Sequence, residues 1–185
     1  MSERTATPRI PLLERDQVTP EVGNVYDALL KTRGVVPNMF KTLAHTPTLA
    51  LATAGYLKAL LSDGALLGYY KELIAMRLSV LLASEYAVKA HALSARQKGA
   101  TEAQVTAARA GFESGPFTDA EKLGFRDADR LHRSATEITD DFFAEMKQQF
   151  TEPQIIELIA TAAAFELFPR FVDALCIPVT PAPDG

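Results

Sequence analysis

The feature that most constrains the fold is a series of helix-start signals that recurs along the chain. Each signal places a capping threonine before a proline or an acidic residue, and apolar residues at helical spacing follow it. The signals are Thr19-Pro20-Glu21, Thr46-Pro47, Thr101-Glu102, Thr118-Asp119-Ala120-Glu121 and Thr151-Glu152-Pro153. No segment alternates apolar and polar residues over a length that indicates a strand. The sequence therefore predicts an all-α fold.

About seven or eight helices follow from these signals and from the breaks between them. Their approximate ranges are 20–33, 46–61, 66–82, 84–97, 102–110, 118–133, 140–150 and 152–169. Glycines at positions 34, 99 and 111 follow three of these ranges, where a helix-ending glycine is favoured. Residues 37–45 are predicted to be a short link. Pro169 is expected to end or kink the last helix, because proline has no backbone N–H to donate.

Length and composition describe a small globular protein. The 185 residues predict a single domain over 1–185, with an N-terminal arm of about 1–18 and a C-terminal tail of about 178–185. A net charge of -4 with scattered basic residues argues against nucleic-acid binding. The most apolar stretch, 73–83, is short and contains Arg77, so no membrane span is expected. No secretory signal is visible, and we expect a cytoplasmic protein.

The chain contains one cysteine, Cys176. A single thiol forms neither an internal disulfide nor a Cys-x-x-Cys redox pair. No phosphate-binding loop is present, and no His, Asp, Glu and Cys residues have the spacing of metal ligands. We therefore expect neither a metal nor an organic cofactor.

The segment from Glu72 to Glu102 carries the most informative pattern. Glu72 is followed twelve residues later by Ser84, and then by Ala87, His91 and Gly99. These positions resemble the core signature of the carboxymuconolactone decarboxylase/alkylhydroperoxidase D family: a Glu, then Cys-x-x-Cys-x-x-x-His, then a glycine turn into the next helix. The resemblance implies an alkylhydroperoxidase D-like helical bundle that assembles as a trimer or hexamer.

The resemblance extends over about residues 34–177. The segment Gly34-Val-Val-Pro37-Asn38-Met-Phe, the helix after Pro47 and the last helix with Arg170 are similar to the peroxidase-related branch of that family. Both cysteine positions are changed, however, to Ser84 and Ala87. Peroxidase chemistry needs a low-pKa thiolate and a second thiol that resolves the sulfenic acid. Serine and alanine supply neither, so thiol peroxidase activity is not expected.

The family also has a branch without the cysteine pair, gamma-carboxymuconolactone decarboxylase, which acts without a cofactor on a small carboxylated lactone from aromatic breakdown. The resemblance therefore implies a cofactor-independent decarboxylase/lyase, isomerase or hydrolase, with Glu72 directed at His91 as a proton relay. The imidazole is suited to take or give a proton near neutral pH, and Ala87 leaves space beside it. The alternatives are a core histidine and an acid that is attracted by the N-terminus of its helix.

The remaining candidates have weaker support. Ser84 and His91 share a helix face but lie about 10 Å apart along the axis, too far for a direct hydrogen bond. Ser84 is a candidate catalytic residue, but an N-cap role is the simpler interpretation. Tyr86 and Ala87 are candidate substrate contacts, although Tyr86 is more typical of aromatic packing.

Two arginines are further candidates for substrate binding. Arg77 lies among apolar residues and needs a carboxylate partner, which is either a protein group such as Glu72 or a substrate. Arg170, near Pro169, has the same potential role.

Three functions thus stay open. The first is an acid/base enzyme on a small carboxylated substrate of the aromatic-catabolism type, with a small molecule and further copies of the chain as its only partners. The second is an alkylhydroperoxidase-like antioxidant protein that uses Cys176. The third is a non-catalytic helical binding or assembly protein that has lost the redox cysteines.

Overall fold

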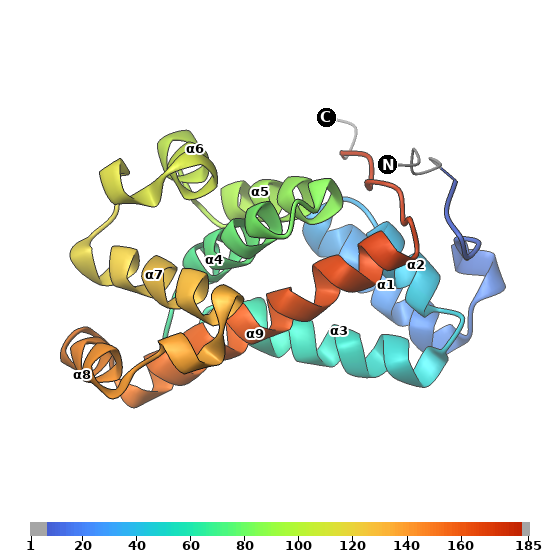
Figure 1. The fold of residues 1–185 in the computed structure, drawn as a ribbon. Coiled ribbons are helices and arrows are strands. Elements are labelled where there is room, and N and C mark those ends of the chain that lie inside the picture. Colours follow the sequence, from blue (N-terminus) through green and yellow to red (C-terminus); the bar gives the residue numbers. More distant parts are fainter. Residues whose placement is uncertain (1–6, 183–185) are drawn as a thin grey trace. The chain divides into compact units, whose positions relative to one another are not determined.

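The computed structural model describes residues 7–182. Within this range the chain forms α-helices and short 3-10 turns, and no strand (Figure 1). The α-helices are α1 (Pro20–Arg33), α2 (Asn38–Leu43), α3 (Pro47–Leu61), α4 (Gly68–Leu81), α5 (Glu85–Gln97), α6 (Glu102–Ala110), α7 (Asp119–Arg133), α8 (Asp140–Gln149) and α9 (Glu152–Ala174). The all-α prediction is confirmed.

The eight predicted helices are present with ends close to those expected, and two details differ. The predicted link over 37–45 contains a helix, α2, which begins after Pro37. The last helix does not end at Pro169 but continues to Ala174, so that expectation is wrong. Proline removes one hydrogen bond in the helix interior, and the apolar residues on both sides of it continue the helical pattern.

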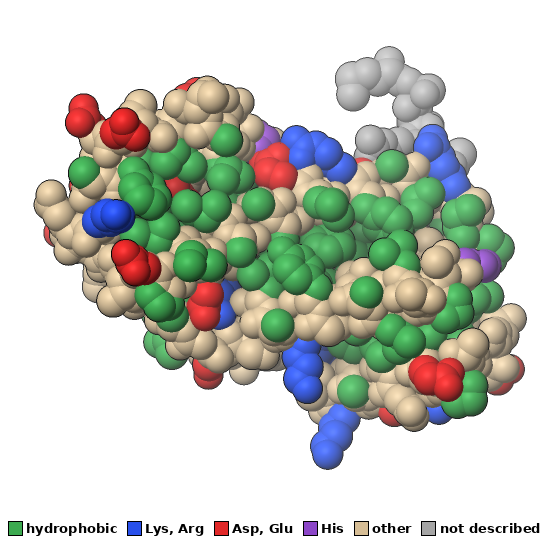
Figure 2. Space-filling model, turned by 90° about the horizontal axis from the view of Figure 1, so that it is seen from below, with side chains coloured by type: hydrophobic (Ala, Val, Ile, Leu, Met, Phe, Trp, Pro, Cys, Tyr) green, Lys and Arg blue, Asp and Glu red, His purple; other side chains and the backbone are tan. Residues whose placement is uncertain are grey.

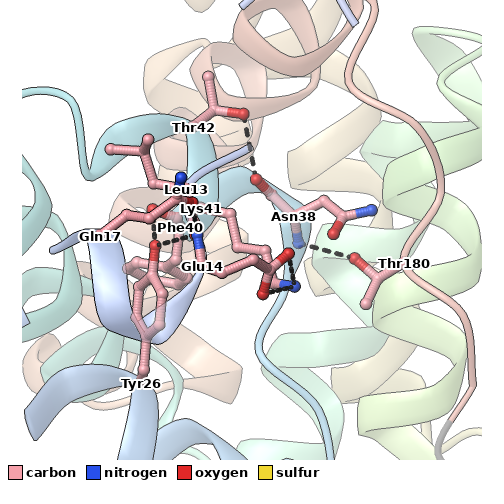
Figure 3. Close-up of polar contacts among 9 residues, drawn as sticks. All are labelled: Leu13, Glu14, Gln17, Tyr26, Asn38, Phe40, Lys41, Thr42 and Thr180. Atoms are coloured by element: carbon pink, nitrogen blue, oxygen red, sulfur yellow. Dashed lines mark hydrogen bonds and ion pairs between the residues drawn. The ribbon is translucent and has the colours of Figure 1, made fainter. Parts of the chain in front are cut away.

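The described chain divides into two compact units. Unit 1 comprises residues 7–59 and 170–182, and unit 2 is Leu60–Pro169. In unit 1 the N-terminal arm runs along α2 and the end of α9, since the backbone N–H of Arg9 donates to Leu175 O at 2.9 Å and that of Leu13 to Lys41 O at 3.1 Å. Asn38 fastens the C-terminal tail: its backbone N–H donates to Thr180 Oγ1 at 2.9 Å (Figure 3).

Unit 2 is built around α4, which is apolar on nearly all sides. Five of its apolar side chains are fully buried, namely Leu73, Ile74, Ala75, Met76 and Leu78. A helix that is hydrophobic all round is stable only when neighbours cover it. Helices α5, α6 and α7 lie against α4, and Figure 1 shows α4 beside α5 and α7. Polar side chains on α4 are therefore held in the interior of unit 2.

Glycine at position 124 permits a close approach between α4 and α7. A Cβ atom there would lie 2.2 Å from the hydroxyl of Tyr70. That hydroxyl donates a hydrogen bond to Glu121 O at 2.6 Å. The two helices are thus joined by a contact that a larger residue at position 124 would prevent.

The turn between α4 and α5 fixes where α5 begins. Ala83 has φ 54°, in the left-handed region that favours glycine. Its N–H donates to Val80 O at 3.0 Å, and the N–H of Ser84 donates to Ser79 O at 2.9 Å. These two bonds form a Schellman motif that ends α4. The motif reverses the chain within three residues, so that α5 returns along α4.

No helix in residues 7–182 combines the length and apolar character needed to cross a membrane. Apolar side chains are nevertheless present on the face drawn in Figure 2. In residues 7–182 as a whole, the large exposed apolar side chains include Leu49, Leu51 and Tyr56 on α3, and Ile156 and Leu167 on α9.

Candidate active site around Glu72 and His91

Glu72 and His91 are in direct contact in the interior of unit 2. Glu72 lies on α4 and is 1% exposed, and His91 lies on α5 and is 8% exposed. His91 Nδ1 is 2.7 Å from Glu72 Oε2. A carboxylate accepts, so Nδ1 carries the proton and Nε2 of the neutral ring carries the lone pair. Glu72 is in the second turn of α4, which argues against a role as a first-turn acid.

Two more side chains of α5 donate to the same carboxylate. Ser94 Oγ lies 2.7 Å from Glu72 Oε1, and Lys98 Nζ lies 2.5 Å from the same oxygen. Lys98 Nζ also donates to Leu61 O at 2.8 Å. The sequence interpretation missed both residues. Their spacing was the available signal, because His91, Ser94 and Lys98 follow one another by three and four residues and so share one helix face.

Phe165 of α9 lies against the imidazole. The two ring centroids are 4.4 Å apart and the planes are inclined by 82°. Ala87 and Tyr86, one turn earlier on α5, are both buried. The ring of His91 is therefore surrounded largely by apolar groups, while its Nδ1 edge is held by a carboxylate. Nδ1 is the ring nitrogen that is bound to Glu72, and Nε2 lies on the other side of the ring.

Ser84 occupies the N-cap position of α5, as expected, but it does not cap the helix with its side chain. The hydroxyl makes no cap hydrogen bond, and its residue is 0% exposed. Ser84 Oγ has no hydrogen-bond partner within the described part of the chain. A buried hydroxyl without a partner costs about 1–3 kcal/mol. A serine at the N-cap usually accepts a hydrogen bond from the helix, so the unpaired hydroxyl of Ser84 is not explained by capping.

Arg77 is bound to a protein carboxylate, but not to Glu72. Its Nε and Nη2 atoms donate to the two carboxylate oxygens of Asp129 on α7, each at 2.8 Å. The guanidinium also lies 5.4 Å from the centre of the Phe112 ring. Five residues along a helix correspond to about 140° of rotation, so Arg77 faces α7 while Glu72 faces α5. The structure therefore gives Arg77 a structural partner and does not bring it to the His91 cluster.

Arg170 and Cys176 both lie in unit 1. Arg170 is exposed on α9 after Pro169. Cys176 follows the end of α9 with φ 50°, and its N–H donates to Asp173 O at 3.2 Å. This is the position at which a Schellman motif usually has glycine. Cys176 thus has a clear role in ending the helix.

A second buried carboxyl of unit 2 has a different environment. Asp127 on α7 is 0% exposed, and neither carboxylate oxygen has a hydrogen-bond partner in residues 7–182. Burial raises the pKa of Asp127 to about 7, and the nearby charge of Arg130 opposes this only in part. The sequence analysis did not identify Asp127 as a buried acid.

Another buried charge, Lys71, has a structural role. Its Nζ lies 2.9 Å from Glu157 Oε2, and Glu157 also accepts the backbone N–H groups of Ala65 and Leu66, each at 3.0 Å. Burial opposes ionisation of Glu157, but these hydrogen bonds prevail and lower its pKa. The pair holds the loop before α4.

Unit 1 has a cavity of about 410 Å³ beside α1 and α2. Its polar lining groups are already bound to one another. Lys41 is paired with Glu14 at 2.8 Å, and the hydroxyl of Tyr26 donates to Leu13 O at 3.1 Å (Figure 3). Arg15 is paired with Asp27 at 3.0 Å. Burial raises the pKa of Tyr26 to about 12, and the charge of Glu14 adds to this effect. The cavity therefore offers fewer polar groups for catalysis than the Glu72 cluster does.

No group of three or more His, Cys, Asp and Glu residues in the described range is arranged as a metal site. The donors around Glu72 are a histidine, a serine and a lysine, and the cluster is organised by hydrogen bonds to one carboxylate.

Comparison with known proteins agrees with this geometry. The sequence model of the carboxymuconolactone decarboxylase family matches residues 47–128, which include Glu72, Ser84, Ala87 and His91. No curated protein matches the sequence.

Solved structures extend the likeness in fold over nearly the whole chain. An alkylhydroperoxidase AhpD core protein, a peroxidase-related protein from Ralstonia eutropha JMP134, has a TM-score of 0.86 and 22% identity, with 94% of this chain and 92% of that one covered. A peroxidase-related protein from Silicibacter sp. TM1040 has a TM-score of 0.85 and 19% identity, with 97% and 95% covered.

A third similar structure is the debrominase Bmp8, as a cysteine-to-alanine variant in complex with 2,3,4-tribromopyrrole. It has a TM-score of 0.82 and 23% identity, with 94% of this chain and 92% of that one covered. At these identities the structures establish the fold, and the family match covers the segment that contains Glu72 and His91. Residues 47–128 thus match the carboxymuconolactone decarboxylase family, the chain has the fold of alkylhydroperoxidase AhpD-like proteins, and it contains a single cysteine.

Proposed function

We propose that the protein is a cofactor-independent acid/base enzyme that acts on a small, ring-sized, carboxylated substrate. The observation that carries the proposal is the Glu72–His91 contact, which engages Nδ1 and makes Nε2 the nitrogen that would act on a substrate. The chain has no cysteine pair, so the chemistry that remains at this site is proton transfer. A decarboxylase/lyase, an isomerase and a hydrolase all use such a step.

In the proposed reaction His91 Nε2 takes a proton from the substrate. The ring becomes an imidazolium, whose charge the Glu72 carboxylate stabilises through the Nδ1 hydrogen bond at 2.7 Å. The proton is then returned to the product from Nε2. Glu72 orients the ring and keeps its tautomer, and it does not itself exchange a proton with the substrate.

Ser84 supplies a second polar contact in this proposal. Its hydroxyl is buried without a partner in residues 7–182, at the N-terminus of α5. A substrate oxygen bound there would remove the cost of the unpaired hydroxyl and would be favoured by the helix dipole. Ser84 and His91 are about 10 Å apart along the helix. A small cyclic acid has the length to reach from one to the other.

The debrominase of similar fold supports a ligand of this size. Its structure contains 2,3,4-tribromopyrrole, a small aromatic ring. Together with the family match, this favours a ring-derived substrate of the aromatic-catabolism type. The role of Arg170 in substrate binding stays a prediction.

Self-association is a further part of the proposal. Exposed apolar side chains on α3 and α9, such as Leu49, Tyr56 and Leu167, support association of identical subunits into a trimer or hexamer. Light scattering after size-exclusion chromatography tests this, and a monomer at micromolar concentration would contradict it.

The test of the proposed function is ultraviolet-monitored turnover of a panel of carboxylated lactones and ring-cleavage dienoic acids. The wild type is compared with His91→Ala, Glu72→Gln and the control His45→Ala. We expect turnover that falls about 10²–10⁴-fold in His91→Ala, the usual contribution of a general base. Turnover that survives in both site variants would reject the assignment and favour a non-catalytic binding protein.

A further inference from the structure

The Glu72 carboxylate has a positively charged partner that the acid/base scheme does not require. Lys98 Nζ contacts Glu72 Oε1, and His91 Nδ1 contacts Oε2. The lysine side chain is 32% exposed, whereas the carboxylate that it reaches is 1% exposed. One buried negative charge is therefore shared by a cation on one oxygen and an imidazole on the other.

We infer that Lys98 is a positioning residue that keeps His91 neutral, and hence able to accept a proton, by neutralising Glu72. The inference rests on the proposed function, in which His91 Nε2 is the base. A carboxylate next to an imidazole favours the charged imidazolium form when no other charge intervenes. An imidazolium has no lone pair and cannot act as a base.

The groups in contact with the pair come from several elements. Helix α4 contributes Glu72, and α5 contributes Ser94 and Lys98. Helix α9 presents the uncharged ring of Phe165. Lys98 is thus a cation in contact with Glu72, whereas Ser94 and Phe165 are neutral.

The position of Lys98 in the fold suits this role. It is the C-cap residue of α5, where the helix dipole favours a positive charge. Its ammonium group is held by a second acceptor, Leu61 O, at 2.8 Å. The following residue, Gly99, has φ 103° and turns the chain away from the site. With two acceptors in place, the ammonium group is fixed beside Glu72 rather than mobile in solvent.

The experiment uses ¹⁵N nuclear magnetic resonance of the histidine side chains at pH 7. Nitrogen shifts distinguish a neutral ring with the proton on Nδ1 from an imidazolium, and His91→Gln assigns the signal among the three histidines. In the wild type we expect the neutral form. In Lys98→Met we expect the imidazolium to gain at least about tenfold relative to the neutral form.

Three further variants make the result specific. Lys98→Arg retains the charge and should retain the neutral ring. Lys89→Met removes a lysine from the same helix, paired with Glu85 at 2.6 Å, and should have no effect. The double variant Glu72→Gln/Lys98→Met should return the ring to the neutral form, because the carboxylate that draws the proton is absent.

A neutral His91 ring in folded Lys98→Met would overturn the inference. An imidazolium that persists in the double variant would also overturn it, since the effect would not act through Glu72. This readout does not depend on turnover. A charge change in Lys98→Met together with a failed substrate panel would therefore reject the proposed function and retain the inference.

Discussion

Two buried carboxyl groups in unit 2 have opposite environments. Glu72 on α4 is 1% exposed and receives hydrogen bonds from His91, Ser94 and Lys98. Asp127 on α7 is 0% exposed, and its oxygens have no hydrogen-bond partner within residues 7–182. Burial raises the pKa of Asp127 to about 7, so it is largely protonated in slightly acidic solution. The two carboxyl groups are thus buried to a similar degree, but hydrogen-bond donors surround Glu72 alone.

The comparison shows that hydrogen-bond donors, and not burial alone, decide whether a buried carboxyl group can carry a charge at low cost. Three donors, one of them a cation, compensate Glu72 for the loss of water and direct its charge at an imidazole. Asp127 has no such compensation and carries a desolvation cost whenever it ionises. A carboxylate with aligned donors is what proton-transfer chemistry needs. An uncompensated acid instead makes stability depend on pH.

The largest expected effect comes from removing the organised carboxylate. Glu72→Ala leaves the Lys98 cation without its partner and removes the hydrogen bonds from His91 and Ser94. We expect the free energy of unfolding at pH 7 to fall by about 3–5 kcal/mol, the usual cost of breaking a buried pair. Urea denaturation measures it. The control is Glu166→Ala, whose side chain is 18% exposed in its pair with His132, and an equal loss there would contradict the comparison.

The next effect concerns the uncompensated acid. Asp127 binds a proton in the folded state up to about pH 7, whereas in the unfolded chain it loses it near 3.8. Because the folded state binds more protons between these values, stability falls as the pH rises from about 4 to 7. The free energy of unfolding lost over this pH range is of the order of 4 kcal/mol. Asp127→Asn should abolish this slope in thermal unfolding between pH 5 and 8.

The exposed Asp141→Asn is the matched control and should keep the slope of the wild type. A slope that is the same in Asp127→Asn and in the wild type would show that Asp127 has a proton acceptor or donor in solution, and the contrast with Glu72 would then be lost.

A smaller effect separates the donors of Glu72 from ordinary buried hydroxyls. Ser94→Ala removes a hydrogen bond to a charged group, and we expect a loss of about 1.5–3 kcal/mol. Ser79→Ala removes a bond of the same length, 2.7 Å, to the neutral carbonyl of Ala75. It should cost about 1 kcal/mol. Equal losses by urea denaturation would mean that Glu72 is not charged.

The smallest effect is expected at the other histidine–glutamate pair. His132 Nδ1 lies 2.7 Å from Glu166 Oε1, which matches the distance in the His91–Glu72 pair. Both side chains are partly exposed, at 24% and 18%, so water competes for the contact. We expect His132→Gln to cost under about 1 kcal/mol and to leave turnover unchanged. A turnover loss as large as in His91→Ala would instead indicate that the catalytic pair is His132 on α7 and Glu166 on α9.

The sequence predicted most of the fold because the signals that define the helices are local. Thr19 and Thr118 cap α1 and α7 with their side chains, and Gly34 ends α1 with φ 75°. The errors arose where tertiary packing prevails over local preference. Residues 38–43 form a buried helix in what was expected to be a link, and α9 continues past Pro169.

The candidate site was predicted only in part. Glu72 and His91 were found through the family spacing. In the structure Glu72 Oε2 lies 2.7 Å from His91 Nδ1. Ser94 and Lys98 were missed because serine and lysine in the last turns of a helix are ordinary surface residues. Their role depends on the way α5 folds back along α4, which is set by the turn at Ala83. Asp127 was missed for the same reason, since its burial comes from neighbouring helices.

The most direct test of the central claim is exchange of substrate hydrogen with solvent deuterium, followed by nuclear magnetic resonance, for the panel compound with the fastest turnover. If His91 Nε2 abstracts a proton, the wild type incorporates deuterium at the reacting carbon, and His91→Gln incorporates it at least about a hundredfold more slowly. Exchange at the wild-type rate in a folded His91→Gln protein would contradict the claim that the Glu72-bound imidazole is the base.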